Sequence, residues 1–224
     1  LRFNMKCSIT HDELCDYVSN QINNIFPDRA KIYSNDIKPY IKETMERIQF
    51  CFKHIKKKYF FSDGQSIFDH LYTDHYAMFL YFLMNTIHVR SRETLIPTKL
   101  FLLNRALHGV DAYFNIELPD IFLFRHPMGT VLGNAKYKNY FAVYQNCTVG
   151  ANADGIYPEF GEGILLFEKS TVLGKSKLGN NVVFGSKASA IDSTIPDDTL
   201  VVGDYPNIRL LENKRTVVDR IFVN

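Results

Sequence analysis

The stretch from Phe160 to Ala190, FGEGILLFEKSTVLGKSKLGNNVVFGSKASA, repeats with a period of six residues. Its apolar anchors are Phe160, Leu166, Val172, Leu178, Phe184 and Ala190. Four places after the first five anchors stand small or β-branched residues: Ile164, Ser170, Ser176, Val182 and Ala188. Neither a helix nor a strand has a six-residue period. A polygonal coil does, because each hexad forms one flat face with its apolar anchor inside and its small residue at the corner.

The repeat is weaker upstream of Phe160. Ala112, Leu118 and Phe124 are also six residues apart. The step from Leu132 to Val149 is one residue short of three hexads, which predicts one tightened corner. The segment from Ala151 to Glu159 breaks the repeat, and we interpret it as a loop that leaves the coil.

The chain before Gly109 has a different composition, because Gly64 is the only glycine there. Apolar residues at helical spacing predict helices over 12–25, 37–55, 68–87 and 98–107, with a turn at Asp63-Gly64. We therefore expect an α+β protein. Its parts would be a helical domain over residues 1–108 and a left-handed parallel β-helix with a C-terminal tail over residues 109–224.

Composition limits the function classes. A net charge of +2 does not indicate a nucleic-acid partner, and the basic run Lys56 to Lys58 is typical of a solvated helix end. The four cysteines have no zinc-like spacing, so we expect free thiols, a reducing cytoplasm and no metal. Leu1 to Asn4 precede no long apolar stretch, and Ala77 to Met84 is too short to span a membrane, so we expect neither a signal peptide nor a membrane span.

Residues 110–210 resemble the catalytic part of the serine acetyltransferases. Val110-Asp111, followed by the segment from His126 to Gly133 (HPMGTVLG), is similar to that family's Val-Asp and His-Ala-Thr-Gly-Ile-Val-Val-Gly, with the same fifteen-residue step from Asp to His. The segment from Cys147 to Gly150 resembles its Val-Thr-Leu-Gly, and Gly203 to Ile208 its closing Gly-x-Pro-Ala-Arg-Ile. A helical domain ahead of the coil is also that family's layout.

The resemblance implies acetyl transfer from acetyl-CoA to a hydroxyl, with His126 as general base. A hydroxyl loses its proton far above pH 7, whereas free histidine titrates near 6.5. Asp111 would hold the other ring nitrogen, because fifteen residues in a coil of about eighteen return close to the same edge. Backbone N–H groups near Gly150 would stabilise the oxyanion. The alternative for His126 is a structural histidine that caps a corner.

The resemblance also places the coenzyme along the last coils. We expect it to contact Gly150, Lys175, Lys187, Ala188 and Arg209. Lys177, Lys214 and Arg215 are weaker candidates, and solvated coil corners are the alternative explanation for the lysines.

Two departures from the family concern the acceptor. Arg125 stands where the family has Asp, and the segment from Gly155 to Pro158 stands where it has Asp-Arg-His-Pro. Because those residues help to hold the amino acid in the family, we expect a sugar or another small hydroxyl compound as acceptor, with serine a poor one. Arg125, Tyr157 and Asp74, a carboxylate of the helical domain, are the expected acceptor residues. Serine acetylation and a non-catalytic hexapeptide scaffold remain alternatives.

The resemblance further predicts a homotrimer or a multiple of one, because coils of this kind close their coenzyme side with a neighbouring subunit. The loop 151–159 has little to pack on within one narrow prism, which supports the same expectation. Light scattering at micromolar concentration should give a mass three times that of one chain, or a multiple of this. A mass near 25.9 kDa with full activity would contradict the trimer.

Overall fold

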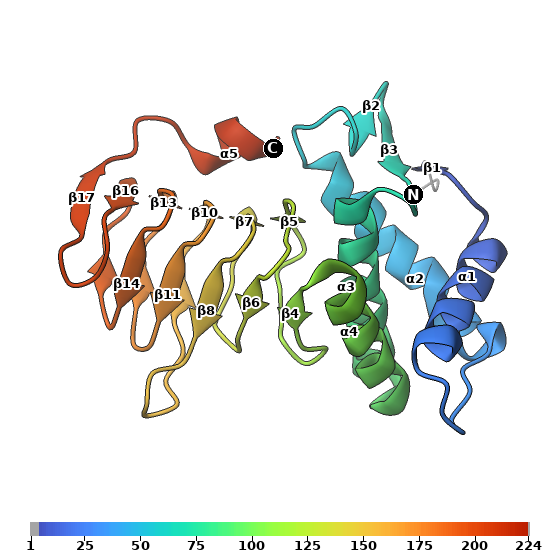
Figure 1. Cartoon of the computed structure of the whole chain (residues 1–224). Helices are drawn as coiled ribbons and strands as arrows, with labels where there is room; N and C mark the ends of the chain where they lie inside the picture. The colour runs from blue at the N-terminus through green and yellow to red at the C-terminus, as the bar shows by residue number, and fades with distance from the viewer. Residues whose placement is uncertain (1–4, 224) are drawn as a thin grey trace.

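The computed structural model describes residues 5–223, so Leu1 to Asn4, on which the expectation of no signal peptide rests, lie outside the described residues. The first half is helical (Figure 1). Its helices are α1 (His11–Ile25), α2 (Ser34–Lys53), α3 (Thr73–Ser91) and α4 (Leu95–His108). A small sheet in the order β1-β3-β2 accompanies them, built from β1 (Met5–Cys7), β2 (Phe61–Ser62) and β3 (Gln65–Phe68).

Helix α3 is the centre of this half and is buried around its whole circumference from Asp74 to Ile87. A helix without a polar face must be covered on all sides. It packs against α2 and α4 and also against the coil at residues 122–124. Tyr81 makes the junction, because its hydroxyl donates to the carbonyl of Ile116 at 2.7 Å and accepts from the N–H of Leu118 at 2.9 Å.

One expected helix begins later than its pattern predicts. Phe68 ends strand β3, and the helix begins at Thr73 rather than at Phe68. Polar side chains form a turn between them: Asp69 accepts from the N–H of Leu71, and Nδ1 of His75 accepts from the N–H of Asp69. Such local side-chain bonds compete with helix formation. The prediction of a helix over 68–72 was therefore wrong, and the small sheet was not predicted.

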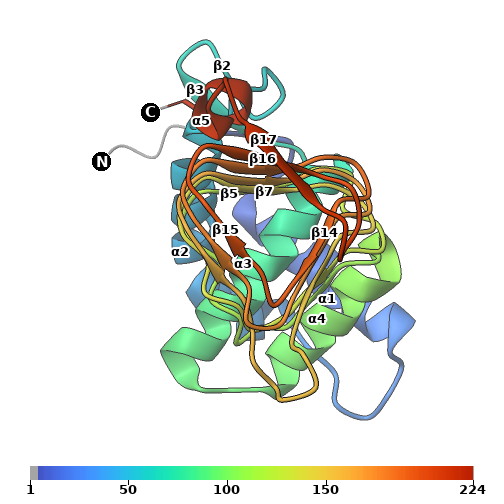
Figure 2. The same ribbon diagram turned by 90° about the vertical axis from the view of Figure 1, so that its left-hand side faces the viewer.

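The second half is a parallel β-helix with three faces, and its outline is triangular when seen along the coil (Figure 2). A six-stranded sheet contains β5 (Phe122–Phe124), β7 (Phe141–Val143), β10 (Ile164–Leu166), β13 (Val182–Phe184), β16 (Thr199–Val202) and β17 (Arg209–Glu212). A five-stranded sheet contains β4 (Asp111–Ala112), β6 (Val131–Leu132), β8 (Thr148–Gly150), β11 (Thr171–Leu173) and β14 (Ser189–Ile191). The third face contains β9 (Glu159–Phe160), β12 (Lys177–Leu178) and β15 (Thr194–Ile195).

The strand registers confirm the hexad prediction. Leu166 pairs with Phe184 and Val172 with Ala190, so partners lie three hexads apart. All six anchors and the five residues four places after them are buried. Leu132 pairs with Val149, one residue short of three hexads, as the sequence predicts. The coil is thus a core of stacked apolar layers whose corners need small side chains.

We name the corners by the faces that they join. The first corner joins the six-stranded to the five-stranded sheet, the second joins the five-stranded sheet to the third face, and the third returns to the six-stranded sheet. At the second corner, residues 151–158 connect β8 to β9 and protrude from the coil (Figure 1). Thr148 therefore pairs with Thr171, five positions more than the spacing of Ile164 and Val182.

The chain returns along the coil after β17, which pairs antiparallel with β16. Helix α5 (Val217–Ile221) lies outside the six-stranded sheet (Figure 2). Asn213 donates to Asn181, and Phe222 packs against Tyr140 and forms a bridge with Ile55. This returning tail therefore ties the coil to the end of α2.

The two halves share one hydrophobic cluster of buried residues that extends from Leu14 to Phe222. Helix α4 ends at His108 and β4 begins at Asp111, where the glycine content of the sequence changes. Within residues 5–223, no helix has the length and apolar character needed to cross a membrane. The four cysteines, Cys7, Cys15, Cys51 and Cys147, are free thiols.

Two buried histidines should make stability depend on pH. Burial lowers the pKa of His75 to about 3 and that of His108 to about 4, whereas unfolded histidine titrates near 6.5. Between these values the unfolded chain binds more protons than the folded chain, so the free energy of unfolding falls as the pH falls. Calorimetry from about pH 7 to about pH 4 should show a falling Tm. His75→Phe and His108→Phe should flatten this dependence, and an unchanged slope in both variants would contradict the assignment.

Candidate functional site

His126 lies on the first corner, at the one place where this corner is longer. Residues 144–147, 167–170 and 185–188 make the later first corners, whereas residues 125–130 join β5 to β6. The two extra residues allow a tight turn in which the N–H of Met128 donates to the carbonyl of His126 at 2.8 Å. His126 has φ 49°, and its side chain is 62% exposed. A long corner thus presents an imidazole to the outside of the coil.

Asp74, in the first turn of α3, holds this corner in place. Its Oδ1 accepts from the backbone N–H of His126 at 2.9 Å, and its Oδ2 accepts from Nη1 of Arg125 at 2.9 Å. The side chain of Asp74 is 2% exposed, and a carboxylate at such a site must be paired. Nδ1 of His126 lies 3.8 Å from Oδ1 of Asp74, within ion-pair range but too far for a hydrogen bond.

Arg125 makes a second contact, because its Nη1 also donates to the hydroxyl of Tyr72 at 2.9 Å. Burial alone would lower the pKa of Arg125, but the bonds to Tyr72 and Asp74 outweigh it and raise this pKa above its usual value.

Beyond the corner, burial raises the pKa of Tyr144, whose carbonyl accepts from the hydroxyl of Thr130. The sequence did not reveal Tyr72 or Tyr144, although Tyr72 stands only two places before Asp74.

Asp111 lies on β4, where it pairs with Val131. Its Oδ2 is 3.5 Å from Nε of Arg105. Within residues 5–223, no ion pair joins Asp111 to His126, and Asp74 is the carboxylate in ion-pair range of the imidazole. The structure therefore brings together His126, Arg125 and Asp74, while the role of Asp111 stays a prediction.

Tyr157 lies at the second corner, on the loop 151–158. Its ring covers Gly133, where an added Cβ would come within 2.6 Å of the ring. Gly133 follows β6, whereas His126 precedes it, so one chain places Tyr157 and His126 at opposite ends of this strand. Tyr157 is therefore not part of the cluster around His126 within a single chain.

The expected coenzyme residues are divided between several places. Gly150 ends β8, and the exposed Lys175 follows at the same second corner, with its N–H bonded to Asp192. Lys187 and Ala188 lie at the first corner, so the five-stranded sheet separates the two groups. Ala188 is fully buried, and its N–H is already donated to Gly185.

The remaining candidates lie on other elements. Arg209 is exposed on β17, and Lys177 is exposed on the third face. Lys214 and Arg215 belong to the returning tail, where Nη2 of Arg215 donates to the carbonyl of Asp219.

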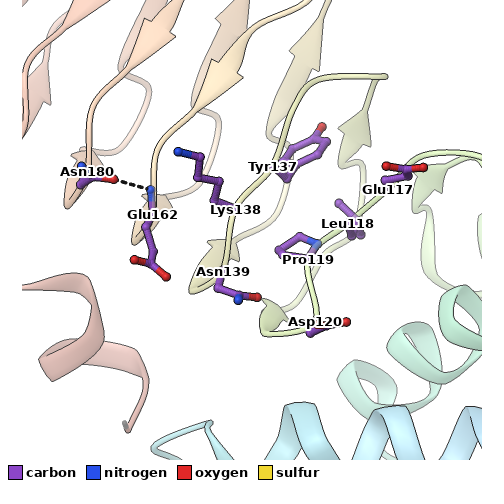
Figure 3. A pocket seen from close by; sticks show the side chains of 9 residues that line it. All are labelled: Glu117, Leu118, Pro119, Asp120, Tyr137, Lys138, Asn139, Glu162 and Asn180. Atoms are coloured by element: carbon purple, nitrogen blue, oxygen red, sulfur yellow. Dashed lines mark hydrogen bonds between the residues drawn. The ribbon is translucent and has the colours of Figure 1, made fainter.

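Two hollows lie at the third corner, away from His126. One, of about 460 Å³, is lined by Glu117 to Asp120, Tyr137 to Asn139, Glu162 and Asn180 (Figure 3). The other, of about 430 Å³, lies beneath the tail and shares Glu162 and Asn180 with the first. In the described part of the chain, no three His, Cys, Asp or Glu side chains are grouped as metal ligands.

Comparison with known proteins gives one consistent relationship. No family model matches the chain. The serine acetyltransferases of two strains of Staphylococcus epidermidis are 25% identical to it over 130 residues, which are 56% of this chain and 61% of those proteins. The chain therefore matches only about three fifths of the length of these relatives.

Solved serine acetyltransferases share the fold over nearly the whole chain. One in complex with cysteine has a TM-score of 0.71 at 15% identity and covers 92% of this chain and 82% of that one. The soybean apoenzyme has a TM-score of 0.69 at 19% identity, with 91% and 84% covered. One in complex with CoA has a TM-score of 0.66 at 13% identity, with 88% and 83% covered. Helices followed by a parallel β-helix, with a matching stretch of sequence, make this chain serine acetyltransferase-like.

Proposed function

We propose that this protein transfers the acetyl group of acetyl-CoA to a hydroxyl of a small acceptor, with His126 as the general base. The observation that supports this most strongly is the extended first corner, which presents an exposed imidazole beside a buried carboxylate. A corner built only to close the coil would keep the length of the three later corners. The sequence relatives are acetyltransferases, which supports the same reaction class.

The proposed chemistry needs one proton carrier. Nδ1 of His126 is the ring nitrogen near Asp74, so Nε2 is the atom that would face the acceptor. His126 would take the hydroxyl proton as the oxygen bonds to the acetyl carbon, and return it to sulfur as the carbon–sulfur bond breaks.

The outer side of the five-stranded sheet is the proposed coenzyme surface. Its outward positions carry the small residues Thr148, Gly150, Thr171 and Ser189, which would permit close approach of an extended ligand, and beside them the apolar Val131, Leu173 and Ile191. Lys175 and Lys187 are exposed along its two edges and could contact phosphates. A serine acetyltransferase of the same fold was solved in complex with CoA, which supports coenzyme binding as a property to test here.

The relatives make serine the first acceptor to test, because the matching proteins are serine acetyltransferases. A sugar or another hydroxyl compound is the second candidate, favoured by Arg125, which occupies a carboxylate oxygen of Asp74 beside the base. A scaffold without activity is separable from both, because only an enzyme of this class should gain thermal stability from coenzyme A.

We further infer a left-handed coil, a homotrimeric assembly and a cytoplasmic location. The hexads with small corner residues support the handedness. The protruding loop 151–158, which places Tyr157 away from His126 in its own chain, supports a neighbouring subunit.

His126→Ala should remove most of the turnover and leave the fold intact, because the side chain is exposed and makes no hydrogen bond of its own within the described chain. Loss of a general base typically lowers the rate by about a hundredfold to ten-thousandfold. Release of the CoA thiol measures the rate, and circular dichroism checks the fold. His88→Ala, at the opposite end of α3, is the matched control. Activity of the His126 variant within a few-fold of the parent would contradict the assignment.

Asp111→Asn tests whether Asp111, rather than Asp74, orients the imidazole during catalysis: in that case kcat should fall by about tenfold to a thousandfold without a change in Tm. Its pairing with Arg105 at 3.5 Å is on the surface and therefore weak, so the carboxylate is available. Asp74→Asn should lower both kcat and Tm, since Asp74 also anchors the corner. Full activity of Asp111→Asn, with a shifted pH–rate profile in Asp74→Asn alone, would assign the orienting role to Asp74.

A further inference from the structure

Arg125 presents an unused edge of its guanidinium beside the base. Its Nη1 donates both of its hydrogens, to Tyr72 and to Asp74. The three N–H groups on Nε and Nη2 have no hydrogen-bond acceptor among residues 5–223. Both nitrogen atoms reach solvent, in agreement with a side chain that is 18% exposed. We call these three groups the free edge of Arg125.

The free edge is held close to His126 by a shared partner. The guanidinium bonds to Oδ2 of Asp74, while the backbone N–H and the ring of His126 face Oδ1. One carboxylate therefore spans the distance between the cation and the base. An acceptor whose hydroxyl lies at His126 would have its neighbouring carbons within reach of Arg125.

Asp74 is not available to an acceptor ammonium group. Both of its oxygens accept hydrogen bonds from the protein, and the residue is 1% exposed. Its charge is balanced by Arg125 at 2.9 Å. The corner thus offers the acceptor the N–H donors of a guanidinium cation. Neither oxygen of Asp74 remains available to accept a hydrogen bond from the acceptor. Such a surface favours an anionic group on the acceptor and gives no stabilisation to a cationic one.

Resting on the function proposed above, we propose that Arg125 determines acceptor specificity by binding a carboxylate next to the reacting hydroxyl. The Nε and Nη2 groups lie on one side of a planar guanidinium and match the two oxygens of a carboxylate. The acceptor then needs no amino group, and the site does not favour acceptors that carry one. The acceptor class is a hydroxy acid, which includes sugar acids and admits serine through its carboxylate alone.

Paired acceptors test this directly. Glycerate should be used at least as well as serine, and better than glycerol or 2-aminopropane-1,3-diol, by about tenfold to a hundredfold in kcat/KM. Glucuronate should exceed glucose in the same direction. Equal use of glycerol and glycerate, or a strict requirement for the amino group of serine, would overturn the proposal.

Arg125→Lys keeps the charge beside Asp74 but loses the planar edge. It should raise KM for glycerate by about tenfold or more and lower kcat/KM for glycerol by a much smaller factor. Arg90→Lys alters a bidentate pair with Glu43 at the far end of α3 and serves as the matched control. An equal loss on both acceptors would show that Arg125 only supports the fold. Arg125→Gln combined with Asp74→Asn removes both charges and repeats the test without a buried unpaired ion.

Calorimetry of glycerate and glycerol with the intact protein and coenzyme A separates this proposal from the proposed function. If no acetyl transfer occurs but glycerate binds and glycerol does not, and Arg125→Lys abolishes the difference, the carboxylate site stands and the enzyme assignment falls. If acetyl transfer occurs and the two ligands bind equally, the enzyme assignment stands and the carboxylate site falls. If neither ligand binds under conditions where coenzyme A does, the carboxylate site also falls.

Discussion

The buried carboxylate of Asp74 is the interaction on which the site depends. It lies at the start of the most buried helix, and it bonds to two consecutive residues of the coil, the side chain of Arg125 and the main chain of His126. Removal of one partner of a buried ion pair is strongly destabilising, because the other charge is then left without compensation. The same contact therefore joins the helical half to the coil and fixes the backbone of the candidate base.

The coil itself places a constraint on where function can be located. Three faces of stacked strands require each turn to close with nearly the same number of residues, and the anchors from Phe160 to Ala190 show how strictly the sequence follows this rule. Extra residues are tolerated only at corners, where they do not disturb the strand pairs. Two corners contain such extra residues: the first corner at His126 and the second corner with the loop that carries Tyr157. At both, polar or aromatic side chains extend away from the coil.

The sequence predicted those features that depend on neighbours along the chain. Period six, small corner residues and the shortened step from Leu132 to Val149 follow from local pattern, and the strand pairs confirm them. It could not predict contacts made by tertiary folding. Asp74 and Arg125 are 51 positions apart, and no periodic signal links them. The strands β1 to β3 are too short for alternation to be visible, and the polar turn at Asp69 hides the true start of α3.

The surroundings of His126 show what the site still requires. Met128 is 70% exposed and Val131 is 41% exposed, so apolar side chains flank a base that is itself open to solvent. Contiguous exposed apolar groups often mark a surface that another molecule covers. Proton transfer between a hydroxyl and an imidazole is more efficient when water is excluded and nearby charges act at short range in a low dielectric. A single chain supplies the candidate base, the carboxylate that anchors its corner and the free edge of Arg125 on one side. In the proposed enzyme, the covering side would come from the coenzyme, the acceptor or another copy of the chain, and the protruding loop 151–158 is one segment that would reach such a copy.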